Sequence, residues 1–362
     1  MNFYDIVKKC ILADVSMALY RLPDDNKIIL VIDKQKAKSI CFDKLYELSE
    51  AFIFHPYKES EENPIWAIEP TFVICSDDKS YSKSFIEYIN SLEIITREDK
   101  ATDKDISHNE YLNKVNDIIN LLNESSLDKL VYSRTKTIEG QGIDKTIDIF
   151  KGLELKYDDA FISFVNISEE ISWIGASPEL LLSMDEDGMH TMALAGTQKC
   201  IDEDIIDKVW DNKDLKEQRY VSDYISSKLE EQTCTFEKGK LRTVKAGNIC
   251  HLQTSYTIEA ENDSYWDIVG ALHPTPAICG MPAKEAADYI DKMENHNRSY
   301  YSGFLGPLNI FCETQMYVNL RSARLCSNSL QLYVGGGITA DSIAHKEWDE
   351  TEMKSTTILN IL

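Results

Sequence analysis

The chain has 362 residues, of which 43% are hydrophobic and 27% charged, and its formal net charge is −23. This composition is that of a globular protein, and the length allows one large domain or two small ones. A surface with such an excess of carboxylates repels phosphate backbones, and no Lys/Arg cluster offsets it. We therefore expect no binding to nucleic acid, and we interpret the negative charge as a feature that keeps the protein soluble.

The sequence also lacks the features of a membrane protein or a secreted protein. No run of about 18 apolar residues is present to form a membrane span, and the apolar run at the start is too short for a signal peptide. The nine cysteines are scattered singly, without a CxxC pair or a zinc-like spacing with histidine. An odd number of isolated cysteines favours reduced thiols, so we expect a cytoplasmic protein.

The first part of the chain is expected to be a scaffold. It predicts short strands over Lys27–Ile32 and Pro70–Cys75, mixed with helical stretches. No glycine precedes Gly140, and all 15 glycines lie from there on. Because glycine lets the backbone approach a ligand closely, we expect the site downstream. We therefore assign residues 1–110 to an N-terminal scaffold within the same fold, and residues 111–362 to the region that contains the site.

The rest of the chain predicts strands and helices in mixed order. Apolar residues at helical spacing from Leu112 to Leu122 indicate a helix. Strands follow over 130–138, 161–166 and 171–174, and then a hairpin that turns at Asp187-Gly188. The remaining predicted elements are a helix over 214–232, a hairpin turning at 246–248, a helix over 282–295, strands over 314–325 and 330–334, and a terminal helix over 342–362. Without strict βαβ alternation, the expected class is α+β with antiparallel sheet.

Two acidic pairs are the sharpest candidates for chemistry. Asp214 and Glu217 are three residues apart near the start of one predicted helix, and Glu347 and Glu350 have the same spacing in the terminal helix. Residues at i and i+3 share a helical face, so each pair directs two carboxylates the same way. Such hard oxygen ligands suit Mg²⁺. Taken alone, each pair is more often a solvated helix face, and Lys354 one turn beyond Glu350 is as consistent with a routine ion pair.

Two glycine-rich segments follow predicted strands. Gly196 and Thr197 end one strand, and Gly335, Gly336 and Gly337 end another just before the terminal helix. Each segment can present backbone N–H groups to an anion, although a structural turn explains the glycines equally well. Neither matches a P-loop or a dinucleotide fingerprint.

Two histidines, His251 and His273, stand in segments where packing is the more usual role. His273 lies in a proline-rich loop between apolar residues, where a histidine is usually a satisfied core group. Cys250 and His251 are adjacent on a predicted strand and therefore point to opposite faces, so we assign both to packing.

Eight short motifs in order resemble the chorismate-utilising enzymes, which include isochorismate, salicylate, anthranilate and aminodeoxychorismate synthases. The resemblance begins at about Leu127 and continues to the C-terminus. The motifs are KLVYSR (129–134), GASPELL (175–181), LAGT (194–197), LHPTPA (272–277), YYSG (300–303), VNLRSA (318–323), GGGI (335–338) and ExxExxxK (347–354). Each is weak alone, but their shared order is specific. The resemblance implies a single large α+β domain with an antiparallel sheet-rich core and outer helices.

The resemblance also implies roles for particular residues. Glu217 and Glu350 would bind Mg²⁺ directly, and Asp214 and Glu347 would support the metal through water or hold its ligands in place. The metal would grip the ring carboxylate of chorismate. Carboxylate-holding groups would be Tyr301, Gly303, Arg321, Lys354 and the glycines at 335–337. Gly196 and Thr197 would line the ring, with His273 near the reacting face.

The choice of subfamily rests mainly on Lys129. In family members that add ammonia, the residue at this position is glutamine, whereas in those that add water it is lysine. A lysine acts as general base only where its surroundings leave it neutral. Glu179 would be a carboxylic acid kept protonated until it donates to the departing hydroxyl. The resemblance thus implies an isochorismate synthase, with no redox cofactor.

Several alternatives stay open from sequence. Salicylate synthases share nearly all these residues and go on to eliminate pyruvate, and a chorismate-binding partner subunit without activity is a non-enzymatic reading. The chain departs from the family pattern in having Gln218 after Glu217, where histidine is common, and Gly336, where alanine is usual. We expect a monomer without a glutamine amidotransferase subunit. Menaquinone synthesis is expected, with siderophore synthesis as the alternative pathway.

Overall fold

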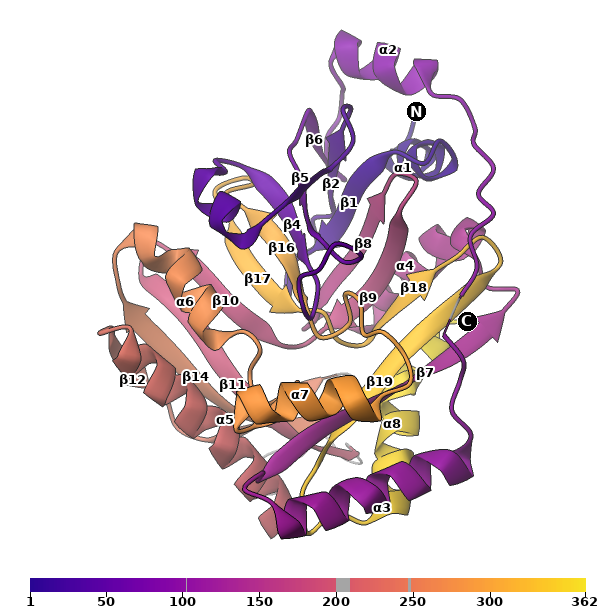
Figure 1. The fold of residues 1–362 in the computed structure, drawn as a ribbon. Helices are drawn as coiled ribbons and strands as arrows, with labels where there is room; N and C mark the ends of the chain where they lie inside the picture. Colours follow the sequence, from indigo (N-terminus) through magenta and orange to yellow (C-terminus); the bar gives the residue numbers. More distant parts are fainter. Residues whose placement is uncertain (102, 200–208, 247–248) are drawn as a thin grey trace.

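The computed structural model describes residues 1–101, 103–199, 209–246 and 249–362, which form two large sheets with helices on their outer sides (Figure 1). Every strand pairing in these ranges is antiparallel. This architecture confirms the predicted α+β class with an antiparallel core.

The first sheet has nine strands. In spatial order they are β15 (Gly280–Met281), β7 (Lys129–Glu139), β19 (Ser329–Ile338), β18 (Ser322–Leu325), β9 (Ile171–Ser177), β8 (Phe161–Ile167), β1 (Ser16–Arg21), β2 (Ile29–Asp33) and β6 (Phe72–Cys75). The long pairing of β7 with β19 sets Lys129 and its neighbours beside the glycines at 335–337.

The second sheet has ten strands, of which β13 (Arg242–Ala246) lies off the main path and pairs with β14. In spatial order the path is β12 (Thr235–Lys238), β14 (Ile249–Glu259), β11 (Gly188–Lys199), β10 (Leu180–Asp185), β17 (Thr314–Val318), β16 (Phe304–Leu308), β4 (Ala51–His55), β5 (Ile65–Ile68) and β3 (Lys38–Ile40). Residues 1–110 therefore supply strands to both sheets.

Helices cover the outer sides of the sheets (Figure 1). They are α1 (Phe3–Leu12), α2 (Lys83–Ser91), α3 (His108–Glu124), α4 (Thr146–Lys156), α5 (Asn212–Glu231), α6 (Tyr265–Leu272), α7 (Ala283–Met293) and α8 (Ala344–Leu359), with short 3₁₀ turns at Phe42–Glu47, Ile143–Lys145 and Asn262–Ser264. In the described ranges, no helix has the length and apolar character needed to cross a membrane.

Helix α3 shows how the sequence produces these elements. Ser107 caps its N-terminus, and Ser107 and Glu110 bond each other's backbone in a capping box. Tyr111, Val115 and Ile118 are buried on one face of the helix. This pattern of caps and apolar spacing is that of an amphipathic helix whose stability comes from packing.

The core between the two sheets is unusually aromatic. Phe52 and Phe54 of β4 and Tyr317 of β17 pack against Phe161 and Trp173 of the first sheet. Phe161 and Tyr317 stack in parallel with ring centroids 4.3 Å apart. This packing fixes the two sheets relative to each other, and the pocket described below draws residues from both.

The structure corrects two predicted elements. Residues 314–325 are two strands, β17 and β18, that belong to different sheets. Arg321 between them has φ +49°, a left-handed conformation that breaks a strand, so the chain can pass from one sheet to the other there. In the β10–β11 hairpin, Asp185 pairs with Gly188, so the turn is Glu186-Asp187, one residue earlier than predicted. The predicted turn at 246–248 lies mostly outside the described residues.

Candidate active site

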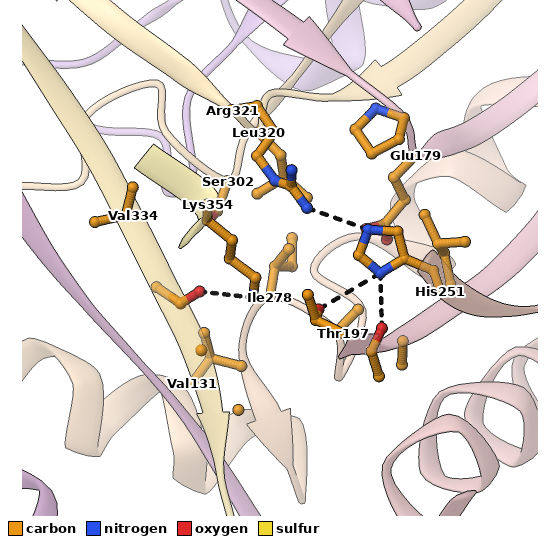
Figure 2. A pocket seen from close by; sticks show the side chains of 18 of the residues that line it. Val131, Glu179, Thr197, His251, Ile278, Ser302, Leu320, Arg321, Val334 and Lys354 are labelled. Carbon is orange, nitrogen blue, oxygen red and sulfur yellow. Dashed lines mark hydrogen bonds between the residues drawn. The ribbon is translucent and has the colours of Figure 1, made fainter. Parts of the chain in front are cut away.

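A pocket gathers most of the predicted site residues (Figure 2). Its walls come from β7, β11, β14, β19, α5 and α8 and from the segments after β9, α6, α7 and β17. The predicted residues that line it are Glu179, Gly196, Thr197, Glu217, Tyr301, Arg321, Gly335, Gly336, Gly337 and Lys354. Apolar residues such as Val131, Leu194 and Ile278 complete the lining.

A β-bulge brings Gly196 and Thr197 to the pocket. The register of β11 against β14 shifts between Ala195 and Gln198, and Gly196 has φ +70°. The bulge releases one or two residues from the ladder, and only glycine adopts such a φ without strain. The sequence therefore places a bulge within β11 at the pocket wall.

His251 connects two predicted substrate-binding residues. Its Nδ1 lies 2.7 Å from the carbonyl oxygen of Gly196, and Arg321 Nη2 lies 3.1 Å from its Nε2 (Figure 2). Because a carbonyl only accepts and a guanidinium only donates, the imidazole carries its proton on Nδ1 and accepts at Nε2. Burial, and next the charge of Arg321, lower the pKa of His251 to about 3, so the ring is neutral.

Glu179 is a buried acid in the turn between β9 and β10. Its side chain lines the pocket and is 4% exposed. Burial raises its pKa to about 8, although Lys129, Lys354 and Arg321 act in the opposite direction. A carboxyl group with this pKa is protonated at neutral pH and can donate a proton.

Lys129 is fully buried at the start of β7, and its Nζ forms an ion pair with Glu217 Oε1 at 2.7 Å. Burial acts to raise the pKa of Glu217, but Lys129 and Lys213 outweigh burial and lower it. Gly337 lies against this pair: a Cβ there would be 2.5 Å from Lys129 Cε and 2.4 Å from Glu217 Oε1. The glycine is therefore required by the space that the pair occupies.

Each of the four predicted metal-binding acids has a partner in the protein. Besides the Lys129–Glu217 pair, Lys213 pairs with Glu347 at 2.6 Å and Lys354 with Glu350 at 2.7 Å. Asp214 accepts a hydrogen bond from Gln198 Nε2 at 2.9 Å, and burial raises the pKa of Asp214 to about 6. Lys354 also donates to the carbonyl oxygen of Gly335 at 2.9 Å.

The chemistry of these acids fits a hard divalent cation. Within the described ranges, no three Asp, Glu, His or Cys side chains are already grouped as around a metal ion. However, oxygens of Glu217, Glu347 and Glu350 all face Gly336 and Gly337, since Cβ atoms there would lie 2.4–3.7 Å from them. Glu347 Oε2 is buried without a hydrogen-bond partner. A buried oxygen of this kind is a free ligand position.

Six predicted site residues lie outside the pocket lining. Lys129, Asp214, Glu347 and Glu350 form the contacts described above, whereas His273 and Gly303 take no part in them. The ring of His273 packs against His55 and Phe304, its Nε2 lies 3.3 Å from the carbonyl oxygen of Tyr57, and burial lowers its pKa to about 4. At Gly303, a Cβ would be 2.0 Å from the carbonyl oxygen of His55. The structure thus places Gly303 where two backbone segments approach closely, and places His273 against the protein interior.

Two residues of the site were missed from sequence. His251 was assigned to packing, but it faces the pocket; Cys250, on the opposite face of β14, is buried. The alternation of a strand predicts the opposite faces but not which face meets a ligand. Lys213 was not singled out, although its position directly before Asp214 on the acidic helix was a usable signal.

The contrast between two neighbouring glycines gives a first prediction. Gly337→Ala should lower kcat about 10- to 100-fold, because overpacking of about 1–3 kcal/mol would separate Lys129 from Glu217. Gly336→Ala is the matched control. A Cβ there lies no closer than 3.4 Å to Glu350 Oε1, so we expect kcat within about threefold of wild type. Equal activities in steady-state assays of the two variants would contradict this reading.

The sequence matches a family model described as chorismate binding enzyme over residues 75–362. The isochorismate synthase DhbC of Bacillus subtilis is 28% identical over 268 residues, which are 70% of this chain and 67% of that protein. The isochorismate synthase EntC of Escherichia coli is 28% identical over 246 residues, 65% of this chain and 62% of that protein. The chain thus spans about two thirds of the length of these relatives, or slightly less.

The fold has a close match among solved structures. The menaquinone-specific isochorismate synthase MenF of Escherichia coli superimposes with a TM-score of 0.80 at 18% sequence identity, covering 98% of this chain and 91% of that one. At this identity the match supports the fold alone.

Proposed function

Because the chain belongs to the chorismate binding enzyme family, we propose that it is an isochorismate synthase that converts chorismate to isochorismate. In this reaction, water adds at ring carbon two, the double bonds shift, and the hydroxyl at carbon four leaves as water. Atoms and charge balance without a redox step. The enzyme is therefore an isomerase of the hydroxymutase type.

The observation that carries the proposal is a buried lysine paired with Glu217 beside a pocket that also holds a protonated Glu179. We assign Lys129 as the base that removes a proton from water, and Glu179 as the acid that protonates the leaving hydroxyl. A water-for-hydroxyl exchange requires one group that takes a proton from water and another that gives a proton to the leaving hydroxyl.

The cationic groups of the pocket support a substrate with two carboxylates. Arg321 Nη1 is 3.2 Å from Thr357 Oγ1, and its Nη2 is held by His251, which leaves its guanidinium fixed in orientation. Lys354 is held by Glu350 and the Gly335 carbonyl at the other wall. We propose that these side chains, with the N–H groups of the glycine segment 335–337, orient chorismate before reaction.

We propose Glu217 and Glu350 as direct ligands of Mg²⁺, with Asp214 and Glu347 in support. When bound, the cation would neutralise the ring carboxylate of the substrate and fix its position. The three lysine–glutamate pairs hold these acids together in the buried site, because unpaired buried carboxylates would be costly.

The direct test is to incubate the purified protein with chorismate and Mg²⁺ and to identify the product by chromatography. Isochorismate as the product, formed without an amine donor, supports the proposal. Release of pyruvate with salicylate would identify a salicylate synthase instead. Anthranilate or aminodeoxychorismate formed only with ammonia, or no turnover at all, would overturn it.

The metal assignment predicts a selective loss of Mg²⁺ response. Glu350→Gln should raise the Mg²⁺ concentration for half-maximal rate by at least about tenfold, because an amide is a weaker ligand than a carboxylate. Glu352→Gln is the control, since Glu352 lies on the same helix but pairs with Lys136 and Arg134. An unchanged Mg²⁺ titration for Glu350→Gln would remove this residue from the ligand set.

The proposal extends to the setting of the reaction. We propose a cytoplasmic monomer that needs no amidotransferase subunit, since water and not ammonia is the nucleophile. Menaquinone synthesis stays a prediction. Relatives of the menaquinone type (MenF) and of the siderophore type (DhbC and EntC) match the chain at similar identity, so identity does not choose between the two pathways.

A further inference from the structure

Behind the pocket lies a buried ion pair that takes no part in the proposed chemistry. Glu294 follows α7, and Arg298 is four residues later; both side chains are 3% exposed. Arg298 Nη2 lies 2.6 Å from Glu294 Oε1, and its Nε lies 2.8 Å from Oε2. This two-point contact is the geometry in which a guanidinium and a carboxylate fix each other's orientation.

The remaining donors of Arg298 hold the backbone of the pocket wall. Nη1 donates to the carbonyl oxygen of Ile278 at 2.7 Å, and Nη2 donates to that of Val131 at 2.9 Å. Ile278 and Val131 both line the pocket, but they come from different elements: the loop after α6 and strand β7. One guanidinium thus ties two separate walls together.

The same pair also bonds the strand that carries the predicted base, and it bonds the backbone of a predicted substrate-binding residue. Glu294 Oε1 accepts hydrogen bonds from the backbone N–H and the hydroxyl of Ser133, both at 2.7 Å, on the strand that begins with Lys129. The carbonyl oxygen of Arg298 accepts from the backbone N–H of Tyr301 at 2.8 Å. Shifts of about 1 Å at reacting groups can cost about 100-fold in rate, so such links matter for turnover.

No other side chain can replace this arrangement easily. Burial acts to raise the pKa of Glu294, but Arg298 outweighs burial and lowers it, so the carboxylate stays ionised. Lysine keeps the charge of arginine but has one nitrogen, which cannot bond the carboxylate and two carbonyls in the fixed fork geometry.

We propose that Glu294 and Arg298 are positioning residues that set the distance between strand β7, with Lys129, and the 277–278 wall of the pocket. The expected effect of the pair on the reaction rate rests on the proposed isochorismate synthase activity. The proposal predicts that kcat depends on this pair more than the KM for chorismate does, because Arg321 and Lys354, the two cationic side chains proposed to bind its carboxylates, stand on other elements.

The test compares Arg298→Lys with Arg21→Lys. Arg21 is a matched control, because it is as buried as Arg298 and its guanidinium also bonds backbone carbonyls. These are the carbonyls of Asp25, Asp158, Tyr157 and Ala160, none of which lines the pocket. Thermal unfolding, kcat, KM and amide hydrogen exchange at Val131 and Ser133 are measured for both variants and for wild type.

We expect both variants to lose thermal stability, but only Arg298→Lys to lose kcat, by about 10- to 100-fold, with KM within about threefold. Exchange at Val131 and Ser133 should accelerate in this variant alone. A kcat within about twofold of wild type for Arg298→Lys, or an equal loss in Arg21→Lys, would overturn the proposal.

Two provisions keep the test decisive. If Arg298→Lys does not fold, Glu294→Gln takes its place under the same criteria, since the amide keeps the shape of the carboxylate. If the wild-type protein does not convert chorismate, the proposed function has failed, and the exchange rates alone decide whether the pair holds β7.

Discussion

Lys129→Met is expected to lower kcat by about 10²–10⁴-fold, the usual cost of losing a general base. Methionine has nearly the length of lysine and fills the same buried space, but its thioether accepts no proton from water. The wild-type lysine is completely buried and 2.7 Å from Glu217. The pair links the two proposed roles, because Glu217 contacts the proposed base and is also a proposed Mg²⁺ ligand.

The measurement is steady-state turnover of chorismate at saturating Mg²⁺, with circular dichroism to establish that the variant is folded. Lys136→Met is the control, since Lys136 lies on the same strand and pairs with Glu352 away from the pocket. Lys129→Met should also lose stability as pH rises, because ionised Glu217 would then be buried without its main partner. A variant that keeps more than a tenth of wild-type kcat would refute the base assignment.

The sequence predicted the secondary structure best where local signals were strong. The helices α3, α5, α7 and α8 and the strands β7 to β11 lie within a few residues of their predicted bounds. The division of residues 314–325 between two sheets was not predictable, because the break at Arg321 depends on a left-handed φ that a non-glycine residue rarely adopts. Of the N-terminal strands, β2 and β6 were predicted, and β1, β3, β4 and β5 were missed. Every residue of β1 and β4 is buried, so these strands lack the alternation of buried and exposed residues that marks a half-buried strand.

The site was predictable only through the order of its motifs. Acid pairs at i,i+3 spacing are common on exposed helices, and nothing local to Glu217 indicates that Lys129, 88 positions away in the sequence, is its partner. Similarly, the alternation of β14 could not show that His251 meets the carbonyl of Gly196 across a bulge. These contacts are products of tertiary packing, which local spacing does not encode.

Glu179→Gln is expected to lower kcat by about 10²–10⁴-fold without destabilising the fold. Glutamine keeps the shape of the protonated carboxyl group but cannot release a proton to the leaving hydroxyl. The folded-state pKa of Glu179 is raised to about 8. At pH values between the ordinary carboxyl pKa and 8, the folded wild-type protein therefore keeps a proton that the unfolded chain has released. Wild-type stability therefore falls as pH rises toward 8, and the glutamine variant, which carries no such cost, should be at least as stable there.

The pH–rate profile separates the acid role from a packing role. If Glu179 is the acid as proposed, only its protonated form is active, and wild-type kcat should fall by about tenfold per pH unit above a midpoint near 8. That alkaline limb should be absent from the low residual activity of Glu179→Gln and retained in Glu170→Gln, a control at an exposed turn between β8 and β9. If Glu179→Gln kept both the limb and near-wild-type kcat, the proton would have to come from another group. The amide is isosteric with the carboxyl group, so a purely catalytic role predicts a loss of activity without a loss of stability. A loss of activity that tracked a loss of stability would instead assign Glu179 to packing.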